Sequence, residues 1–379
     1  MKYLCFYDSE TGRRKIKMAS VNKINYICSA LNRVGIDVEI VSCSMTAPQK
    51  MRTTAEKLNS HTSVRYFRTS KEAKSMPGKV LQLIRRNLTI FWYLLFHTKK
   101  GERVIAYHSL INMRSVLLAK KIKRFRLILE AEEIYNDVFQ RSAASRKTEM
   151  RYLQSAEQYL FPTELLAEKI NPEHKPQALV YGAYQAERGK TTQKRPVNGK
   201  IRVAYTGSFD PNKGGLKGAL EAARFLDERY QLCILGTDTP ERVKALKEHI
   251  ALHSGKDSCE ICYDGIKKGK AYTDYLKTCQ IGLSTQNPDA GFNNTSFPSK
   301  VISYLSCNLR VVSYPIEVLT SSALNDVLYY YTQNTPQAVA NAIMGVDVNA
   351  DYDGQSVISA LDSAFLEQLR QMDLKGEVE

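Results

Sequence analysis

IRVAYTGSFDPNKGGLKGALEAARFLDERYQLCILG, residues 201–236, decides the fold class of this chain. IRVAYTG (201–207) has the composition of a buried strand that ends at a glycine, and ALEAARFLDERY (219–230) is typical of an amphipathic helix. LCILG (232–236) then indicates a second strand. A strand, a helix and another strand in this order are characteristic of an α/β fold with a parallel sheet.

The same alternation continues in both halves of the chain. The other predicted strands are 3–7, 37–41, 104–107, 127–130, 179–184, 281–285 and 310–314, and the other predicted helices cover 24–34, 110–123, 148–160, 241–250 and a segment beginning at Pro298. We therefore expect two Rossmann-like, doubly wound domains over 1–184 and 201–350, with a polar linker at 185–200. The tail 351–379 is expected to form a helix that packs back on the first domain.

Composition favours a cytoplasmic protein. The chain has 379 residues, is 43% hydrophobic, and starts with MKYLCFYDSE, which does not resemble a signal peptide. Its eight cysteines are scattered, as expected for free thiols. Cys259 and Cys262 form the only close pair, which is more typical of an ordinary strand than of a zinc or redox site because no second pair accompanies it.

Positive charge is concentrated in the first half. Residues 1–190 carry 34 Lys and Arg against 17 Asp and Glu, whereas residues 191–379 carry 20 against 22. A basic half is suited to an anionic membrane, a phosphorylated lipid or nucleic acid. No zinc-finger spacing, RNP-like run or basic zipper is present, so nucleic acid is the least favoured of the three partners.

The segment VLQLIRRNLTIFWYLLF, residues 80–96, is strongly apolar but includes Arg85 and Arg86. Those arginines and its short length argue against a transmembrane span. It is compatible with a helix at the lipid interface, with Phe91, Trp92 and Phe96 inserted, or with an ordinary helix packed on a sheet. Lys99 and Lys100, which follow it, slightly favour the membrane.

Three loops of the second half are candidates for binding phosphate. They are TGSFDPNKGGLKG (206–218), YDGIKKGK (263–270) and QNPDAGFNNTSFPSK (286–300). In doubly wound folds, ligands bind beyond the carboxyl ends of the strands, where glycines, helix amides and lysines favour anions. Lys213 and Lys217 belong to the first loop. Lys300 opens the helix after Pro298, at a position that usually favours an acid, and an external anion would explain it.

These segments resemble a known family. YTGSF, LKGALEAARFL, YDGI and FPSKVISYLSCNLRVVS are similar to the donor-nucleotide domain of GT-B glycosyltransferases, especially glycosyltransferase family 4. EAEEIY (130–135) and VYGAY (180–184) resemble the acceptor domain of members that assemble bacterial polysaccharides. The resemblance implies a GT-B fold, with the two domains facing across a cleft, and retaining transfer of a sugar from a nucleotide donor, a UDP-sugar above all, without a metal or another cofactor.

The resemblance also assigns residues. Lys217 matches the lysine of the family's KG helix start, Ser299 and Lys300 match the start of the diphosphate-binding helix, and His108 lies where many members have a histidine near the donor sugar. We therefore name His108, Lys217 and Lys300 as catalytic candidates. The expected donor-binding residues are Gly207, Ser208, Lys213, Gly265, Ile266, Asn293, Asn294, Thr295, Ser299 and Ser303.

Two departures from the family pattern stand out. The family's pair of glutamates, eight positions apart, falls on Thr295 and Ser303, and the arginine that often follows the glycine turn is Ser208. Because the second glutamate usually anchors the donor ribose, Asn293 or Asn294 would have to contribute to nucleotide recognition. The loss of both acids also suggests an alternative, a non-catalytic scaffold in an assembly complex.

The acceptor is expected to be a lipid-diphosphate-linked glycan at the inner face of the cell membrane. Glu132 and Glu133 follow the strand 127–130 and are candidates to orient its hydroxyl, or they simply fill the first turn of a helix. Arg13 and Arg14 are further acceptor candidates. The only Asp-x-Asp motif, at Asp351 and Asp353, lies in the tail without a strand before it, so no metal site is predicted.

Overall fold

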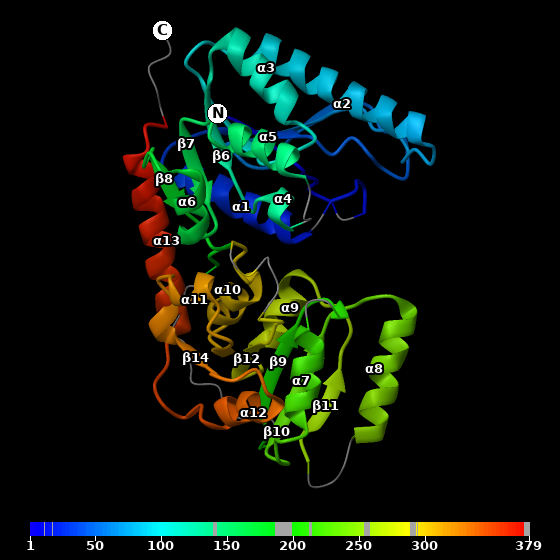
Figure 1. Ribbon diagram of the computed structural model, residues 1–379, viewed down its shortest axis with the longest axis vertical. Helices are drawn as coiled ribbons and strands as arrows, with labels where there is room; N and C mark the ends of the chain where they lie inside the picture. Colours follow the sequence, from blue (N-terminus) through cyan, green and yellow to red (C-terminus); the bar gives the residue numbers. More distant parts are fainter. Residues whose placement is uncertain are drawn as a thin grey trace. The chain divides into compact units, whose positions relative to one another are not determined.

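The computed structural model describes residues 1–10, 12–16, 18–138, 142–185, 199–211, 214–253, 258–288, 293 and 295–374. The chain divides into two compact α/β units (Figure 1). Unit 1 consists of Met1–Ala183 and Ser363–Glu379, and unit 2 of Tyr184–Asp362. The predicted linker lies outside the described residues from 186 to 198.

Unit 1 is built on an eight-stranded sheet with the order β3-β4-β2-β1-β5-β6-β7-β8. All neighbouring strands are parallel except β3, which runs antiparallel to β4 at the sheet edge. The strands are β1 (Lys2–Cys5), β2 (Val38–Ser42), β3 (Thr54–Lys57), β4 (Thr62–Tyr66), β5 (Arg103–Tyr107), β6 (Arg126–Glu130), β7 (Gln158–Phe161) and β8 (Gln177–Leu179).

Helices cover both faces of this sheet, as crossover connections between parallel strands require. The helices that begin in unit 1 are α1 (Met18–Arg33), α2 (Met76–His97), α3 (Met113–Lys123), α4 (Tyr135–Val138), α5 (Ala143–Leu153) and α6 (Glu164–Ile170). The C-terminal part of α13 (Gly354–Gln371) also belongs to unit 1, where Phe365 stacks on Tyr26 of α1 at 5.7 Å between ring centroids.

Unit 2 has a six-stranded, fully parallel sheet with the order β11-β10-β9-β12-β13-β14. Its strands are β9 (Ile201–Thr206), β10 (Tyr230–Leu235), β11 (Glu260–Tyr263), β12 (Ile281–Ser284), β13 (Arg310–Ser313) and β14 (Leu328–Tyr330). Its helices are α7 (Gly215–Ala223), α8 (Pro240–His253), α9 (Gly269–Leu276), α10 (Ser299–Ser306), α11 (Glu317–Thr320), the short 3-10 helix Asn325–Val327, α12 (Pro336–Met344) and the first part of α13. Two doubly wound parallel-sheet units confirm the predicted fold class.

Helix α10 shows how local sequence sets the architecture. Pro298 is its N-cap residue with extended backbone, and Asn308 adopts the left-handed conformation (φ 60°) that ends the segment, as predicted. The apolar side chains of Val301, Ile302 and Leu305 are buried. Gly282 of β12 allows the helix to lie close to the sheet, because a Cβ there would be 2.4 Å from the Tyr304 ring.

Three predicted elements were wrong in extent, and two strands of unit 1 were not predicted. The strand predicted at 179–184 is β8, which ends at Leu179. The predicted helix at 148–160 is the end of α5 followed by β7, because Tyr159 and Phe161 alternate into a fully buried strand. The predicted helix at 219–230 starts earlier, at Gly215, and ends at Ala223. The strands β3 and β4 were not predicted. The edge strand β3 is polar and mostly exposed, and β4 is a short strand of alternating buried and half-buried residues.

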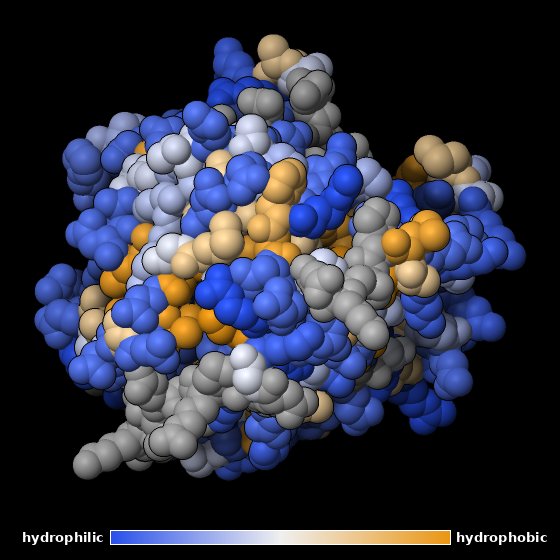
Figure 2. Space-filling view, turned by 90° about the horizontal axis from the view of Figure 1, so that it is seen from below, coloured by the Kyte–Doolittle hydropathy of each residue, from blue (hydrophilic) through white to orange (hydrophobic). Residues whose placement is uncertain are grey.

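Most of the molecular face in Figure 2 is hydrophilic, and its hydrophobic residues form short patches among charged ones. Such a surface is ordinary for a folded protein. Within the described part of the chain, no helix combines the length and the continuous apolarity that crossing a bilayer requires.

Candidate functional site

The order of strands in unit 2 reverses between β9 and β12, where β10 and β11 continue on one side and β13 and β14 on the other. Pairing of β9 with β10 extends to Thr206, whereas pairing of β9 with β12 ends at Ala204 and Gly282. The two strands therefore separate at their carboxyl ends. A crevice at such a switch point is the usual ligand site of a doubly wound sheet.

Glycines line the carboxyl edge of the three strands on one side of this switch. Gly207, Gly236 and Gly265 follow β9, β10 and β11, with φ of 153°, 153° and 68°. The Gly207 N–H donates to the Leu235 carbonyl (3.1 Å), and the Gly236 N–H donates to the Gly265 carbonyl (2.9 Å). A Cβ at Gly236 would lie 2.1 Å from the Gly207 carbonyl oxygen, so only glycine fits there. Because glycine has no side chain, a ligand can approach the backbone closely at this edge.

The two helices that follow β9 and β12 begin without the usual capping groups. Among the described residues, no side chain caps α7, with Gly214 at its N-cap, or α10, with Pro298, and neither helix has an acid in its first turn. By contrast, the Thr335 hydroxyl caps α12 in the same unit. Helix N-termini carry partial positive charge, and a missing cap and acid leave this charge available to an anion.

Lys300 lies against the glycine turn of β9. Its Nζ is 4.5 Å from the centroid of the Tyr205 ring and would be 3.7 Å from a Cβ at Gly207. The Tyr205 hydroxyl donates to the Ser208 carbonyl (3.3 Å), so the ring that supports the ammonium group also holds the turn. The structure thus brings together Gly207, Ser208 and Lys300, three residues that were predicted to bind the donor.

Hydrogen bonds behind the turn fix its position. The N–H of Thr206 donates to the buried Tyr304 hydroxyl (2.9 Å), which occupies the gap that β12 leaves beside β9. The Thr206 hydroxyl lies 3.2 Å from the hydroxyls of both Tyr304 and Tyr272. Thr285 donates to the Gly215 carbonyl (2.6 Å) and so joins the loop after β12 to the start of α7. These contacts make the edge rigid.

Two predicted residues of the same edge are exposed. The Lys217 side chain is 78% exposed in the first turn of α7, and its Nζ is 3.7 Å from Glu221. Ile266 follows Gly265 and is 58% exposed. Lys217 as a catalytic residue and Ile266 as a donor-binding residue stay predictions.

The predicted nucleotide-recognition residues after β12 are mainly buried or engaged within their own segment. Asn293 is 3% exposed, and its Nδ2 donates to the carbonyls of Asn287 (2.7 Å) and Pro288 (3.0 Å). Thr295 is also buried, while Ser299 is exposed and its carbonyl accepts from the Ser303 hydroxyl (3.4 Å). The closed environment of Asn293 indicates that it shapes the loop. Lys213 and Asn294 lie outside the described residues.

His108 follows β5 at the carboxyl edge of unit 1 but is completely buried. Its Nδ1 is 3.1 Å from the Glu133 carbonyl, and its Nε2 is 3.1 Å from the buried Glu149 carboxylate. Glu149 also accepts from the N–H groups of Tyr135 (2.8 Å) and Asn136 (2.9 Å). Burial opposes ionisation of Glu149, but its bonds to His108 and Asn136 outweigh it and lower the pKa. This burial does not fit the predicted direct contact between His108 and a donor sugar, which would require an accessible ring.

The last residue of β6 is a buried acid that the sequence analysis did not select. Glu130 is 1% exposed and accepts from the Tyr3 hydroxyl (2.5 Å). Burial, with the nearby Glu132 carboxylate, raises the pKa of Glu130 to about 8. Glu132 is partly exposed and bonded to Lys23 of α1 (2.6 Å). Of the two predicted acceptor acids, Glu132 therefore forms an ion pair with Lys23, and the backbone carbonyl of Glu133 contacts His108.

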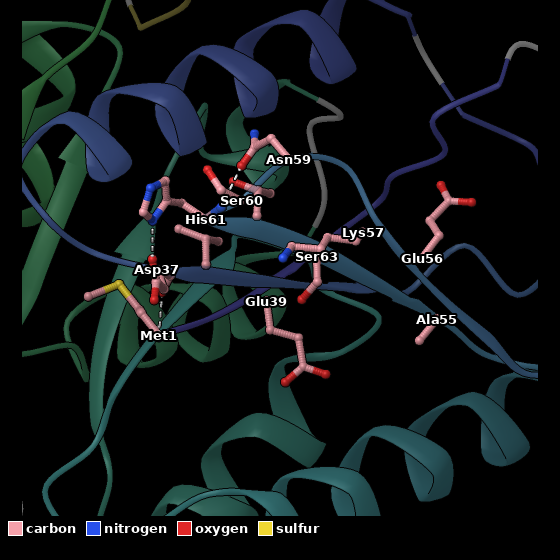
Figure 3. Close-up of a pocket in the computed structure, with 12 residues that line it drawn as sticks. Met1, Asp37, Glu39, Ala55, Glu56, Lys57, Asn59, Ser60, His61 and Ser63 are labelled. Atoms are coloured by element: carbon pink, nitrogen blue, oxygen red, sulfur yellow. Dashed lines mark hydrogen bonds and ion pairs between the residues drawn. The ribbon is translucent and has the colours of Figure 1, made fainter.

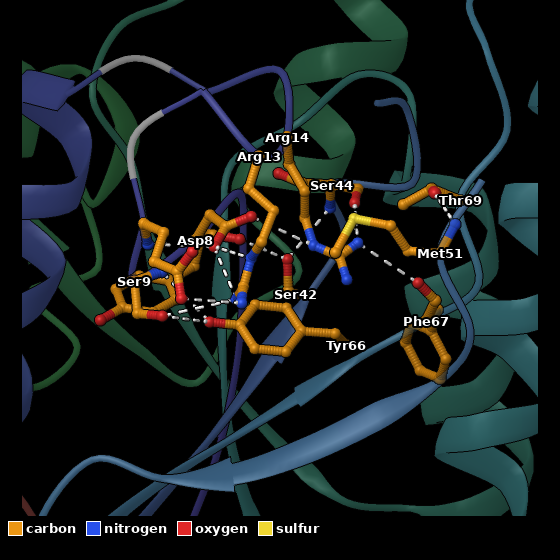
Figure 4. A network of polar contacts seen from close by, with 12 residues as sticks. Asp8, Ser9, Arg13, Arg14, Ser42, Ser44, Met51, Tyr66, Phe67 and Thr69 are labelled. Atoms are coloured by element: carbon orange, nitrogen blue, oxygen red, sulfur yellow. Dashed lines mark hydrogen bonds and ion pairs between the residues drawn. The ribbon is translucent and has the colours of Figure 1, made fainter. Parts of the chain in front are cut away.

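Arg14 is buried and Arg13 is half-buried, and both lie beside Asp8 and Tyr66 (Figure 4). The Arg13 Nε donates to the buried Asp8 carboxylate (2.9 Å), and the Arg14 Nε is 3.3 Å from the other Asp8 oxygen. Both guanidinium groups lie over the Tyr66 ring, at 4.8 and 4.5 Å. Arg14 also donates to the Ser44 and Phe67 carbonyls. At 3% exposure, Arg14 is a structural residue, which corrects its assignment to the acceptor.

A hollow of about 530 Å³ in unit 1 lies at the amino-terminal edge of the sheet, opposite to the carboxyl edge (Figure 3). Met1, Asp37 and His61, which line it, immediately precede β1, β2 and β4. The exposed His61 ring is 2.8 Å from Asp37. Because ligands of parallel sheets bind at the carboxyl edge, we do not assign this hollow to the reaction. Among the described residues, no group of three His, Cys, Asp or Glu side chains is arranged to hold a metal ion.

Comparison with known proteins supports the same architecture. No model of a known protein family and no curated protein matches the chain. Solved structures do. The chain has the GT-B fold. Anabaena Alr3699/HepE in complex with UDP and glucose aligns at 14% identity over 98% of this chain and 97% of that protein, with a TM-score of 0.60.

Trehalose-phosphate synthases give similar alignments. The UDP-forming enzyme of Burkholderia xenovorans in complex with glucose-6-phosphate matches at 11% identity, over 98% of this chain and 96% of that one, with a TM-score of 0.65. A trehalose-6-phosphate synthase studied with bisubstrate glycomimetics, for glycosyl transfer with retention, matches at 11% identity over 99% and 98%, with a TM-score of 0.65. At these identities, the likeness establishes the fold.

Sequence reasoning missed the residues that hold the site together. Tyr205 and Tyr304 looked like ordinary core positions of a strand and a helix, and Asp8 looked like a polar residue after a strand. A usable signal existed for Asp8 and Glu130, since each ends or follows a central strand where an acid is unexpected. No local pattern indicates that the Tyr304 hydroxyl accepts from Thr206, 98 residues away.

Proposed function

We propose that this protein is a retaining glycosyltransferase that uses a nucleoside-diphosphate sugar, a UDP-sugar in the first instance. The observation that carries the proposal is the placement of Lys300 and of two uncapped helix starts beside the Gly207 turn, at the switch point of unit 2. The UDP-containing and UDP-forming neighbours support the choice of nucleotide. The motifs of residues 201–314 support membership in glycosyltransferase family 4.

The chemistry follows from this arrangement. The anomeric C–O bond of the donor breaks, and the electron pair leaves with the nucleoside diphosphate. Lys300 and the N-termini of α7 and α10 stabilise the negative charge that develops there. The acceptor hydroxyl attacks from the face that the diphosphate leaves, which retains the anomeric configuration, and its proton passes to a phosphate oxygen. In this scheme the protein supplies no metal and no general base.

We further propose that the acceptor is a lipid-diphosphate-linked glycan of bacterial surface polysaccharide assembly, and that the enzyme works at the inner face of the membrane. The resemblance of EAEEIY and VYGAY to acceptor domains of such enzymes and the strongly basic first half support this choice. The buried Asp8 and Arg14 are not part of the proposed contact, whereas the half-buried Arg13 stays a candidate.

The decisive experiment incubates the purified chain with a lipid-diphosphate acceptor and a panel of UDP- and GDP-sugars. We expect one donor to yield a glycosylated lipid with retained anomeric configuration, measured by mass spectrometry and NMR, and Lys300→Met to abolish turnover. The absence of product with every donor, or full activity of Lys300→Met, would refute the proposal.

One observation favours a second candidate, a non-catalytic scaffold. The family's acidic pair falls on Thr295, which is buried, and on Ser303, whose hydroxyl donates to the Ser299 carbonyl within α10. A thermal-shift screen separates the two candidates. UDP or GDP should raise the melting temperature of a transferase, because a ligand that binds only the folded state stabilises it. The melting temperature of a scaffold should not change.

A further inference from the structure

We propose that helices α2 and α3 of unit 1 form a docking surface for an anionic lipid bilayer. The docking face is defined by the exposed apolar residues of these two helices and by the lysines and arginines around them. The proposal goes beyond the transfer reaction and does not depend on it, because lipid binding is measurable without a donor or an acceptor.

Exposed apolar side chains are concentrated on these helices. Of the fifteen large hydrophobic residues that are exposed in the described part of the chain, ten lie on α2 and α3. Those ten are Met76, Val80, Leu81, Leu83, Ile84, Leu88, Trp92, Phe96, Leu118 and Ile122. So large a cluster on a folded unit marks a surface that another phase or molecule covers.

The geometry of α2 suits a surface helix. Six of its exposed side chains, from Met76 to Phe96, recur at every fourth residue, so consecutive ones share a face. With 22 residues, the helix is about 33 Å long. Trp92 and Phe96 stack at 5.6 Å, the kind of aromatic pair found at lipid headgroup level. Its opposite side is anchored, since Ile90, Tyr93 and Leu94 are buried in the core of unit 1.

Helix α3 extends this face. It lies beside α2 (Figure 1), and its buried residues Val116 and Ala119 join the same core cluster. Leu118 and Ile122 remain 52% exposed on its outer side. Both helices are packed on the core of unit 1, so the exposed apolar residues lie on a folded surface.

The charge of this segment selects an anionic surface. Residues 68–126 contain fifteen lysines and arginines but only two acids, so they account for thirteen of the fifteen net positive charges of the chain. Both acids, Glu72 and Glu102, are already paired, with Lys15 and Lys2. Anionic lipid is matched by cations around an apolar insert, which is the arrangement of this segment. Each cation near such a surface raises affinity about fivefold.

The single tryptophan of the chain makes a direct test possible. Trp92 is 49% exposed on the docking face, so tryptophan fluorescence, excited selectively over that of the 22 tyrosines, reports on this face. We expect vesicles of phosphatidylcholine with phosphatidylglycerol to shift its emission to the blue and to sediment the protein, and pure phosphatidylcholine vesicles to bind at least about tenfold more weakly. High salt should weaken the binding.

Two double variants separate the two components. Leu81→Asn with Leu88→Asn removes exposed apolar groups without touching the core, and Lys79→Gln with Lys121→Gln removes exposed cations. Each should lower affinity for the anionic vesicles about tenfold or more. Leu252→Asn, at the most exposed of the large apolar residues and on α8 of unit 2, should have no effect.

Several outcomes would overturn the proposal. One is unchanged Trp92 emission and no sedimentation with anionic vesicles, and another is equal binding to neutral vesicles. A third is a protein that does not bind vesicles but forms a dimer in analytical ultracentrifugation. If Leu81→Asn with Leu88→Asn dissociated that dimer, the face would be a self-association surface. A fluorescence response to oligonucleotides but not to vesicles would assign it to nucleic acid.

Discussion

The ammonium nitrogen of Lys300 lies 4.5 Å from the centroid of the Tyr205 ring, so α10 places a cation against the end of β9. Tyr205 in turn donates to the carbonyl of Ser208 in the exposed turn after that strand. A tyrosine of the strand thus links the cation to the backbone that would face a diphosphate. The first prediction concerns this pair.

Lys300→Met should weaken UDP or GDP binding about tenfold to a hundredfold, because a charge-assisted hydrogen bond contributes about 1.5–3 kcal/mol. Isothermal titration calorimetry measures the change. Lys247→Met, at an exposed lysine of α8, serves as the matched control and should bind normally. If Lys217→Met loses more affinity than Lys300→Met, the assignment of Lys300 to the diphosphate is wrong.

Gly215→Ala should destabilise unit 2 by about 1–3 kcal/mol, since overpacking of a rigid site forces its neighbours apart. The added Cβ would lie 2.6 Å from the Tyr205 hydroxyl and 2.8 Å from the Thr285 carbonyl oxygen. We expect the melting temperature to fall by about 2–4 °C for each kcal/mol. Gly345→Ala, where φ is −73°, is the control and should melt near the wild type.

Asp8→Asn should destabilise unit 1 by about 3–5 kcal/mol, because it leaves the buried Arg14 guanidinium without a counter-charge. Thermal unfolding followed by circular dichroism measures the loss. Glu10→Gln provides the comparison, since the Glu10 side chain is largely exposed and its carboxylate is 3.3 Å from Arg13. Equal melting temperatures for the two variants would contradict a structural role of Asp8.

Glu130→Gln should change how stability depends on pH. The folded-state pKa of Glu130 is about 8, above its ordinary value of 4.5, so the folded protein binds one more proton between these values. Stability therefore falls as pH rises through this window and levels off above about pH 8. The variant lacks this loss, so its melting temperature relative to the wild type should increase from about pH 5 to pH 8. A constant difference across that range would show that Glu130 does not titrate there.

Much of the fold was accessible from local pattern. The strands β1, β2, β5, β6, β9, β10, β12 and β13 each fall within two or three residues of a predicted strand, because a buried parallel strand is a short, continuous apolar run. The run 158–161 was misread as helix, since periodicity alone does not separate a short buried strand from a buried helix segment. The polar β3 carries no apolar signal at all.

The candidate site was predictable only in part. Glycine turns and a lysine at a helix start are local features, and they indicated Gly207, Ser208 and Lys300 correctly as neighbours. Burial is not local. His108 and Arg14 look like available functional residues in the sequence, but long-range packing encloses them with Glu149 and Asp8. An ion pair between residues distant in sequence becomes visible only when the sheet brings their elements together.

The order of residues alone determined that this chain forms two doubly wound α/β units with a glycine- and lysine-rich edge in the second, because backbone conformation and apolar periodicity act over a few residues. Tertiary structure alone decided which polar groups remain available, because desolvation and pairing depend on every element packed around a side chain. It also decided that α2 packs along only part of its length and leaves Trp92 and its apolar neighbours exposed.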